Sequence, residues 1–374
     1  MRAEPGDRCE PGPVVAGLRP TRYPAEVRYP RAVASWHDAP MSRIDIEALE
    51  DEWEDDHRPE PRRNRDLSVA ARARIDGLDV ARVVGVDRGR ITVLYDGDIV
   101  EAALAGTMRG TKAAVGDRVR VRAPKHEQDR PRIVEVLDRE TVLTRTADDA
   151  LDEERVVVAN ADLVVVVLAA DYLDVGSRFL DRVMVAASVG GLDTALCINK
   201  IDLLGTGSDE VRAQVEAVTA RYAAGGVEVV VTSAETGEGI EELRRLVAGG
   251  WTAFAGHSGV GKSSLFNHLV PGAAQAVAEI GRYGGRHTTV AAWALEAPAL
   301  NAWIIDTPGV RSFGLGGLKP EELHRHFPEL AALRCQLDDC THTGEPGCEL
   351  PTSDIDPDRL ATYERLLASL RPEG

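Results

Sequence analysis

The sequence of 374 residues predicts a multidomain protein in which an N-terminal β-barrel precedes a doubly wound α/β domain and a small α-rich unit that binds a metal ion. Short alternating strands separated by turns predict the barrel. Apolar strands that alternate with helical segments predict a mostly parallel sheet covered on both faces. Three cysteines and a histidine close together near the C-terminus predict the metal-binding unit. We place these units at residues 69–145, 146–316 and 317–374.

Residues 1–68 precede the barrel and are rich in proline and charge, with acids concentrated between Glu47 and Glu60. No helical or strand period is sustained there, so the stretch cannot bury enough apolar surface to offset the entropy of ordering. We therefore predict a disordered, acidic extension. The formal net charge of -17 argues against a nucleic-acid partner. Much of that charge belongs to the extension, however, and the folded units are less acidic.

Three features of the composition bear on the compartment. The sequence contains no run of eighteen or more apolar residues that could cross a membrane, and the N-terminus lacks the apolar region of a signal peptide. Three of the five cysteines crowd beside His342, which suits a metal site in a reducing compartment better than a disulfide framework. We predict a cytoplasmic, monomeric protein without a membrane partner.

Five short runs predict the strands of the barrel: Val80 to Val86, Ile91 to Tyr95, Ile99 to Leu104, Val119 to Val121 and Ile133 to Leu137. An OB-fold is the leading candidate, and a barrel without a ligand is the alternative. Basic side chains cluster at the later strands, which an inert barrel does not require and which favours contact with RNA. They are Arg118, Arg120, Arg122, Lys125, His126, Arg130 and Arg132.

A phosphate-binding loop follows an apolar strand at Thr252 to Ala255 and precedes a helix that begins at Ser264. Backbone amides of such a loop, together with the N-terminus of the next helix, bind phosphate oxygens. Lys262 is expected to reach the terminal phosphates and act in catalysis, and Ser263 to ligate Mg²⁺. The nucleotide site predicted here consists of Gly256, His257, Ser258, Gly259, Val260, Gly261, Lys262, Ser263 and Ser264.

The choice of base is made by Asn199-Lys200-Ile201-Asp202, which follows another apolar strand. The Asp202 carboxylate can accept hydrogen bonds from N1–H and the 2-amino group of guanine, whereas adenine offers neither donor there. Lys200 would lie along the base plane, and Asn199 would tie the loops together. Ser233 and Ala234 fit the loop that meets guanine O6 through a backbone amide. The site is therefore predicted to bind GTP and GDP.

A third motif, Asp306-Thr307-Pro308-Gly309, follows the strand at Trp303 to Ile305. Asp306 is expected to hold Mg²⁺ through water, and the amide of Gly309 to meet the γ-phosphate. One threonine of the preceding segment should complete the magnesium shell when GTP is bound. We favour Thr289, and Thr288 is the alternative.

The order of these motifs is circularly permuted, because the guanine loop at residue 199 precedes the phosphate loop at residue 256. With the barrel, the entry Ala159-Asn160-Ala161-Asp162, the segment from Gly285 to Thr289 and the cysteine cluster, the chain resembles the RsgA (YjeQ) family over about residues 75–370. The resemblance implies a GTPase that acts late in maturation of the small (30S) ribosomal subunit and contacts its rRNA. It also implies that the subunit stimulates hydrolysis and that hydrolysis is tied to release.

Catalysis must do without one common side chain. Many GTPases place a water-orienting glutamine directly after the glycine of the third motif, and here that position is Val310. His287 is the nearby titratable candidate, since a neutral imidazole can hold the attacking water. The alternative is that His287 is merely an exposed loop residue. The resemblance favours the catalytic role, because a histidine recurs at this place in the family's motif.

The metal ligands predicted near the C-terminus are Cys335, Cys340, His342 and Cys348. Three thiolates and one imidazole suffice for tetrahedral zinc and leave no open position for catalysis. The resemblance implies one structural zinc on the same residue types, and free thiols are the alternative.

Three functions are compatible with the motifs. The first is a GTP phosphohydrolase that depends on the ribosome, and the second is a module that only holds GTP, with Val310 marking lost turnover. Intact Lys262, Ser263, Asp306 and Thr289 favour the enzyme. The third is a GTPase that serves a different RNA or a membrane.

Overall fold

The computed structural model describes residues 69–370, apart from 88, 125, 127–128, 147–153, 205–208, 274–291, 308–312, 316 and 338. All of them lie in the unit that spans Arg58–Gly374. The predicted extension at residues 1–68 is outside the described residues.

The barrel follows a short helix, α1 (Val69–Asp76), and its five strands lie within two residues of the predicted runs. They are β1 (Asp79–Asp87), β2 (Arg90–Tyr95), β3 (Asp98–Leu104), β4 (Arg118–Arg122) and β5 (Arg132–Val136), with a 3₁₀ turn, η3 (Gly106–Met108), after β3. They pair in the order β1-β2-β3-β5-β4, and an additional β1–β4 pairing closes the barrel. Val83, Val93, Val119 and Ile133 are fully buried inside it, which confirms the predicted barrel.

Within the described part of the chain, the central sheet contains six strands in the order β10-β9-β8-β11-β13-β12. All neighbours pair in parallel except β12 with β13. The strands are β8 (Leu163–Ala169), β9 (Asp193–Asn199), β10 (Glu228–Val231), β11 (Trp251–Ala255), β12 (Ala292–Ala297) and β13 (Ala302–Asp306). Because β11 pairs with both β8 and β13, the phosphate-loop strand lies at the centre of the sheet although it comes late in the chain.

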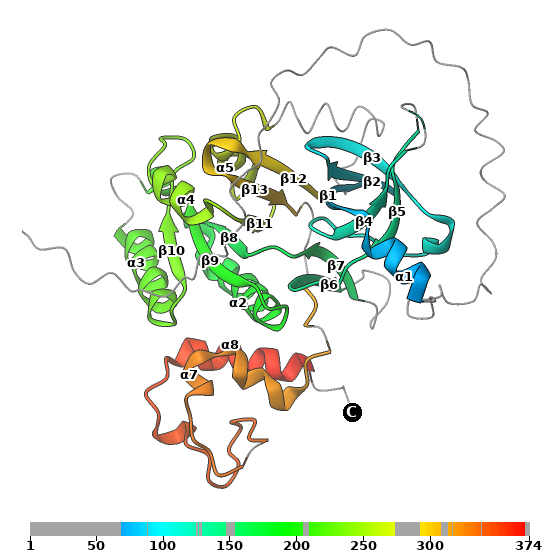
Figure 1. Cartoon of the computed structure of the whole chain (residues 1–374). Helices are drawn as coiled ribbons and strands as arrows, with labels where there is room; N and C mark the ends of the chain where they lie inside the picture. Colours follow the sequence, from blue (N-terminus) through cyan, green and yellow to red (C-terminus); the bar gives the residue numbers. More distant parts are fainter. Residues whose placement is uncertain are drawn as a thin grey trace, which may run out of the picture. The chain divides into compact units, whose positions relative to one another are not determined.

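Helices cover both faces of this sheet (Figure 1). On one face, α2 (Leu173–Val189) and α3 (Asp209–Ala224) pack against Val164, Val166 and Leu168 of β8. On the other, α4 (Ile240–Val247) and α5 (Lys262–Leu269) pack against the alternate residues Val165 and Val167. Both sides of β8 are therefore apolar, as expected of a strand in a covered parallel sheet. The short connections η4 (Ala170–Tyr172), η5 (Ile201–Leu203) and η6 (Pro298–Leu300) are 3₁₀ turns.

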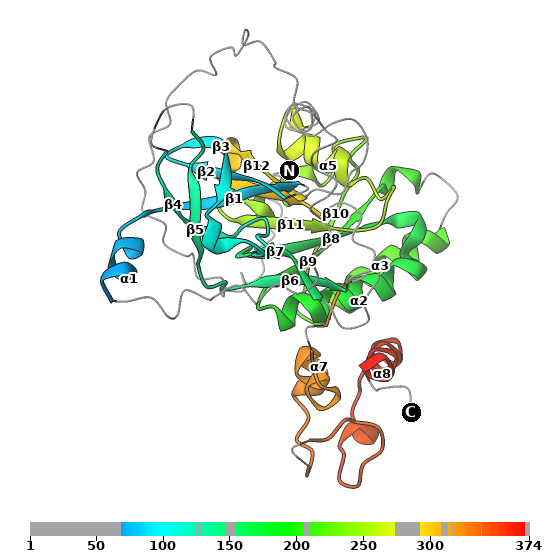
Figure 2. The ribbon, with the colours of Figure 1, turned by 90° about the vertical axis from the view of Figure 1, so that its right-hand side faces the viewer.

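One feature of the fold was not predicted from sequence. Strand β1 of the barrel pairs antiparallel with β12, so barrel and central sheet form one sheet of eleven strands (Figure 2). Gly85 lies opposite Trp293 in this pairing, and a Cβ atom at residue 85 would stand 1.9 Å from the indole ring. The guanidinium of Arg82 also stacks 3.5 Å above the ring of Trp251. Strands β6 (Val142–Thr146) and β7 (Glu154–Ala159) form a separate hairpin.

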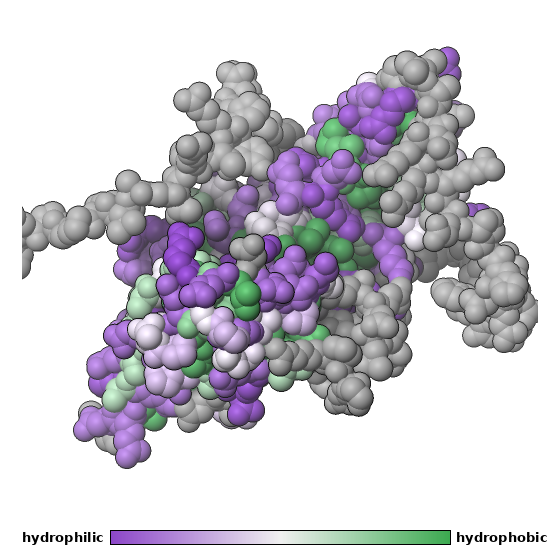
Figure 3. Space-filling view, turned by 90° about the horizontal axis from the view of Figure 1, so that it is seen from below, coloured by the Kyte–Doolittle hydropathy of each residue, from purple (hydrophilic) through white to green (hydrophobic). Residues whose placement is uncertain are grey.

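The C-terminal unit consists of η7 (Pro320–His326), α7 (Pro328–Ala331), η8 (Leu350–Thr352) and α8 (Pro357–Leu370). The rings of Phe327 and Tyr363 meet edge to face with centroids 5.4 Å apart, and both residues are buried. Among the described residues, no helix is long and apolar enough to cross a membrane. Figure 3 shows one face of the molecule, on which hydrophilic residues predominate and hydrophobic ones occur in small groups.

Candidate functional site

The phosphate loop connects β11 to α5, as the sequence predicts. Lys262 starts the helix, and its Nζ donates hydrogen bonds to the carbonyl oxygens of Gly256 (2.5 Å) and His257 (3.0 Å). Burial lowers the pKa of Lys262, and the charge of Asp306 opposes that shift. Ser258, Gly259, Ser263 and Ser264 are exposed, whereas Val260 is buried under the loop. The exposed face of the loop is thus the one that a phosphate would meet.

Asn199 joins the guanine loop to the phosphate loop. Its side-chain Nδ2 donates to the carbonyl oxygen of Val260 at 2.9 Å. Its Oδ1 accepts from the hydroxyl of Thr232 and from the amide of Ala234, both at 3.1 Å. Gly261 makes this approach possible, since a Cβ atom there would lie 2.3 Å from Asn199 Nδ2. One buried amide therefore fixes three segments that are distant in sequence.

The Asp202 carboxylate is held in place at the rim of the site. The hydroxyl of Ser233 donates to Asp202 Oδ1 at 2.5 Å, which links the two loops that were predicted to read the base. Lys200 adopts a left-handed backbone conformation with φ of 67°, which is uncommon for a residue other than glycine and typical of functional turns. The structure thus brings Asn199, Lys200, Asp202, Ser233 and Ala234 into one loop cluster beside the phosphate loop.

Asp306 is the acid that the sequence predicts to hold Mg²⁺. Burial raises its pKa, and the Lys262 charge and the Thr307 amide oppose the rise. Its Oδ1 is buried and has no hydrogen-bond partner among the described residues. A buried carboxylate oxygen without a donor is costly on its own. A hydrated Mg²⁺ would satisfy it, so Asp306 fits the metal together with the exposed hydroxyl of Ser263.

Other predicted site residues cannot be placed. His287, Thr288, Thr289, Gly309 and Val310 lie outside the described residues. What the structure does place is the start of β12 at Ala292 and the end of β13 at Asp306, which are the two strands that flank these segments.

Helix α2 makes contacts that the sequence did not indicate. The ring centroid of Phe179 lies 4.4 Å from that of His257 in the phosphate loop and 5.8 Å from that of Phe313. Arg182 Nε, on the same helix, donates to the carbonyl oxygen of Phe313 at 2.8 Å. Both Phe179 and Arg182 lie in a helix whose apolar period explains its packing, so no motif marked them. The phosphate loop and the chain beyond Asp306 are therefore both packed on α2.

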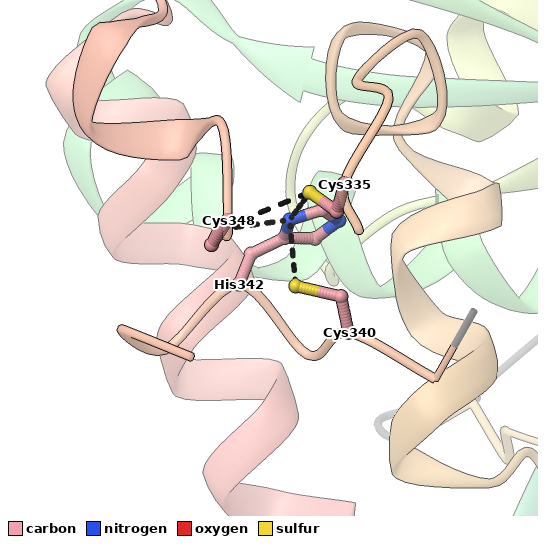
Figure 4. Close-up of side chains that lie close together, drawn as sticks. All are labelled: Cys335, Cys340, His342 and Cys348. Carbon is pink, nitrogen blue, oxygen red and sulfur yellow. Dashed lines mark hydrogen bonds between the residues drawn. The ribbon is translucent and has the colours of Figure 1, made fainter. Parts of the chain in front are cut away.

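The candidate metal centre brings together all four predicted ligands (Figure 4). His342 Nδ1 lies 3.5 Å from Cys335 Sγ, 3.7 Å from Cys340 Sγ and 3.6 Å from Cys348 Sγ. For zinc with bonds of about 2.3 Å to sulfur and about 2.0 Å to nitrogen, tetrahedral geometry places ligand atoms roughly 3.5–3.8 Å apart. Burial raises the pKa of the Cys340 thiol to about 12, so its thiolate requires a nearby cation. The donor set fits one structural zinc.

Glu345 supports this centre and was missed from sequence. Its carboxylate accepts from the amides of Thr341 (2.9 Å) and Thr343 (2.7 Å), which closes the loop that carries His342. Burial alone would raise its pKa, but hydrogen bonds from the Thr341 hydroxyl and from backbone amides lower the pKa of Glu345 to about 2. Tyr363 of α8 donates to the carbonyl oxygen of Thr341 at 2.7 Å. The ligand loop is thereby attached to the helix beneath it.

Comparisons with known proteins agree with this arrangement. The family model described as RsgA GTPase matches residues 136–316. The small ribosomal subunit biogenesis GTPase RsgA of Gemmatimonas aurantiaca is 38% identical over 283 residues, which cover 72% of this chain and 90% of the relative. The protein of the same name from Bacteroides fragilis is 34% identical over 263 residues, or 68% of this chain and 83% of the relative.

Two solved structures are similar in fold. The crystal structure of YjeQ from Thermotoga maritima matches with a TM-score of 0.62 and 30% identity, covering 79% of this chain and 99% of that chain. YloQ, described as a circularly permuted GTPase, matches with a TM-score of 0.60 and 20% identity, covering 80% of this chain and 98% of that chain. The permuted order deduced from the motifs is thus accompanied by the corresponding fold.

Proposed function

The chain belongs to the RsgA GTPase family and is a GTP hydrolase, and from this premise we propose that the small (30S) ribosomal subunit stimulates its hydrolysis of GTP to GDP and phosphate. The observation that carries the proposal is a contrast within the site. Asn199, Lys262 and Asp306 are assembled, yet Val310 stands where a glutamine usually orients water. Such a site needs help to turn over quickly, and the relatives' name points to the partner that provides it.

Each side chain of the site has a role in this reaction. Asp202 and the loop at Ser233 and Ala234 bind guanine, while the phosphate-loop amides and Lys262 bind and orient the phosphates. Ser263, Asp306 and Thr289 would hold Mg²⁺, which when bound neutralises charge on the phosphate oxygens. His287 would hold the attacking water, and the amide of Gly309 would contact the γ-phosphate.

Replacing His287 by alanine should leave GTP affinity within about threefold and lower subunit-stimulated turnover by a factor on the order of a hundred. His287→Gln should retain more turnover than His287→Ala, because an amide can also orient water. Single-turnover hydrolysis with an excess of small subunits measures both variants. Full stimulated turnover in His287→Ala would place the catalytic group elsewhere, including on the subunit.

The barrel is the part of the chain that we assign to rRNA. Several of its arginines are engaged in ion pairs, for example Arg118 with Glu140 and Arg130 with Glu101. Arg122 and Arg132 lie directly opposite each other on β4 and β5, and both are exposed. Like charges in this position are unfavourable unless an anion lies between them, and an RNA phosphate would serve. Subunit affinity that did not fall with rising salt concentration would contradict this assignment.

Helix α2 supports coupling of hydrolysis to release of the enzyme at a late stage of subunit maturation. Phe179 and Arg182 contact the phosphate loop and Phe313, as described above. Between them Asp181, which is 3% exposed, accepts hydrogen bonds from Arg359 (3.0 Å) and Thr362 (2.9 Å) of α8. A change at the γ-phosphate would thus reach the C-terminal unit through one helix. Undiminished retention of the chain on small subunits after hydrolysis to GDP would contradict the coupling.

A further inference from the structure

The loop that reads the guanine 6-position is held by a side chain that no motif includes. His268 lies in the last turn of α5, and its Nε2 is 2.8 Å from the carbonyl oxygen of Ala234. A carbonyl oxygen only accepts hydrogen bonds, so Nε2 must carry the proton. The bond forms with either the neutral Nε2–H tautomer or the imidazolium. His268 is therefore a donor to this loop in both protonation states.

The position of His268 in the helix gives this bond its significance. Helix α5 begins at Lys262, at the end of the phosphate loop, and ends at Leu269. Its first turn thus belongs to the phosphate site, and its last turn contacts the base-reading loop. The end of the helix is fixed in turn, because Arg244 Nη2 of α4 donates to the carbonyl oxygen of His268 at 2.9 Å. The helix spans the distance between the two halves of the nucleotide site.

The rest of the loop leaves a role for this contact. Asn199 Oδ1 accepts from the Ala234 amide, and Ser233 is engaged by Asp202 and by the Thr236 amide. These bonds hold the loop on the side of the guanine loop. Among the described residues, the His268 bond is the one that ties the Ala234 carbonyl to the helix behind the phosphate loop.

We propose that His268 is a positioning residue for guanine specificity. It fixes the distance between the backbone of the Ala234 loop and the phosphate site, so that a backbone amide of the loop can donate a hydrogen bond to O6 of the base. The proposal rests on guanine nucleotide binding by this family and is independent of stimulation by the ribosomal subunit. Loss of the donor would let the loop move relative to α5. Discrimination at the base would then suffer, while the phosphate loop would stay intact.

The test is equilibrium binding of GDP, IDP and ADP to the full chain without ribosomal subunits. His268→Ala should weaken GDP and IDP equally, by about two- to tenfold, the range expected for one neutral hydrogen bond. IDP keeps O6 but lacks the 2-amino group, so it separates this effect from one at Asp202. ADP affinity should not change, because adenine has no oxygen at position 6. The intrinsic kcat for GTP should also stay the same while KM rises.

Two variants complete the experiment. His268→Gln, which keeps a donor, should bring GDP affinity back to within about twofold of the unsubstituted chain, and Asn267→Ala, an exposed neighbour on the same turn, should have no effect. Unchanged GDP affinity in His268→Ala, or an equal loss for ADP, would overturn the proposal. Failure of the unsubstituted chain to prefer GDP over ADP would instead overturn the assignment of the whole base site.

Discussion

Asp202→Asn is expected to lower affinity for GTP by about a hundredfold or more and to create affinity for xanthosine triphosphate. The carboxylate is oriented by the Ser233 hydroxyl at 2.5 Å, so it would not have to be ordered when a nucleotide binds. Guanine offers two donors to it, N1–H and the 2-amino group. Xanthine has an oxygen at position 2, which suits an amide donor instead. A site built around a particular donor pattern rejects the wrong base strongly.

Competition binding of the two triphosphates to the variant measures this exchange of specificity. The control is Asp209→Asn, an exposed acid at the start of α3, which should leave both affinities unchanged. GTP affinity that survives in Asp202→Asn would remove Asp202 from the base site.

Loss of zinc should unfold the C-terminal unit from about Leu333 onward and leave nucleotide binding in place. Structural zinc sites contribute roughly 10–16 kcal/mol of apparent binding free energy at pH 7, and this energy is coupled to folding. Here the ligand loop carries the carbonyl to which Tyr363 donates, so α8 would lose a partner when the loop opens. We therefore expect residues from about Leu333 onward to lose hydrogen-exchange protection after chelation.

The matched variants are Cys340→Ser and Cys197→Ser. Cys340 is a predicted ligand, and its serine variant should contain much less than one zinc per chain by elemental analysis. Cys197 is buried in β9 outside the cluster, and its serine variant should keep the full zinc content. Stoichiometric zinc in Cys340→Ser, or full protection after chelation, would contradict a structural role.

Much of the fold followed from local patterns in the sequence. The barrel strands and the apolar strands β9, β11 and β13 have periods or lengths that are set by residues close together in the sequence. The pairing of β1 with β12 could not be predicted, because it joins two edges through Gly85 and Trp293, which are distant in sequence. Sequence periodicity carries no information about which edges meet.

The residues of the candidate site also fall into those that a sequence motif reveals and those that only the folded chain reveals. Residues whose spacing is set by the group they bind, as in the phosphate loop and the cysteine cluster, could be located from the sequence. Side chains that act through a tertiary contact could not. Phe179, His268 and Glu345 lie on ordinary helices or loops, and only the folded chain brings them to His257, Ala234 and Thr341.

We propose that this chain is a GTPase whose turnover depends on the small ribosomal subunit. The most direct measurement is the initial rate of phosphate release from GTP by the full chain, alone, with purified small subunits and with purified large subunits. We expect slow release by the chain alone, because Val310 cannot orient water. We also expect at least a roughly tenfold increase with small subunits that saturates near one subunit per enzyme, and no increase with large subunits. Equal rates in all three reactions would contradict the proposal, and the absence of phosphate release in every reaction would make the chain a module that only holds GTP.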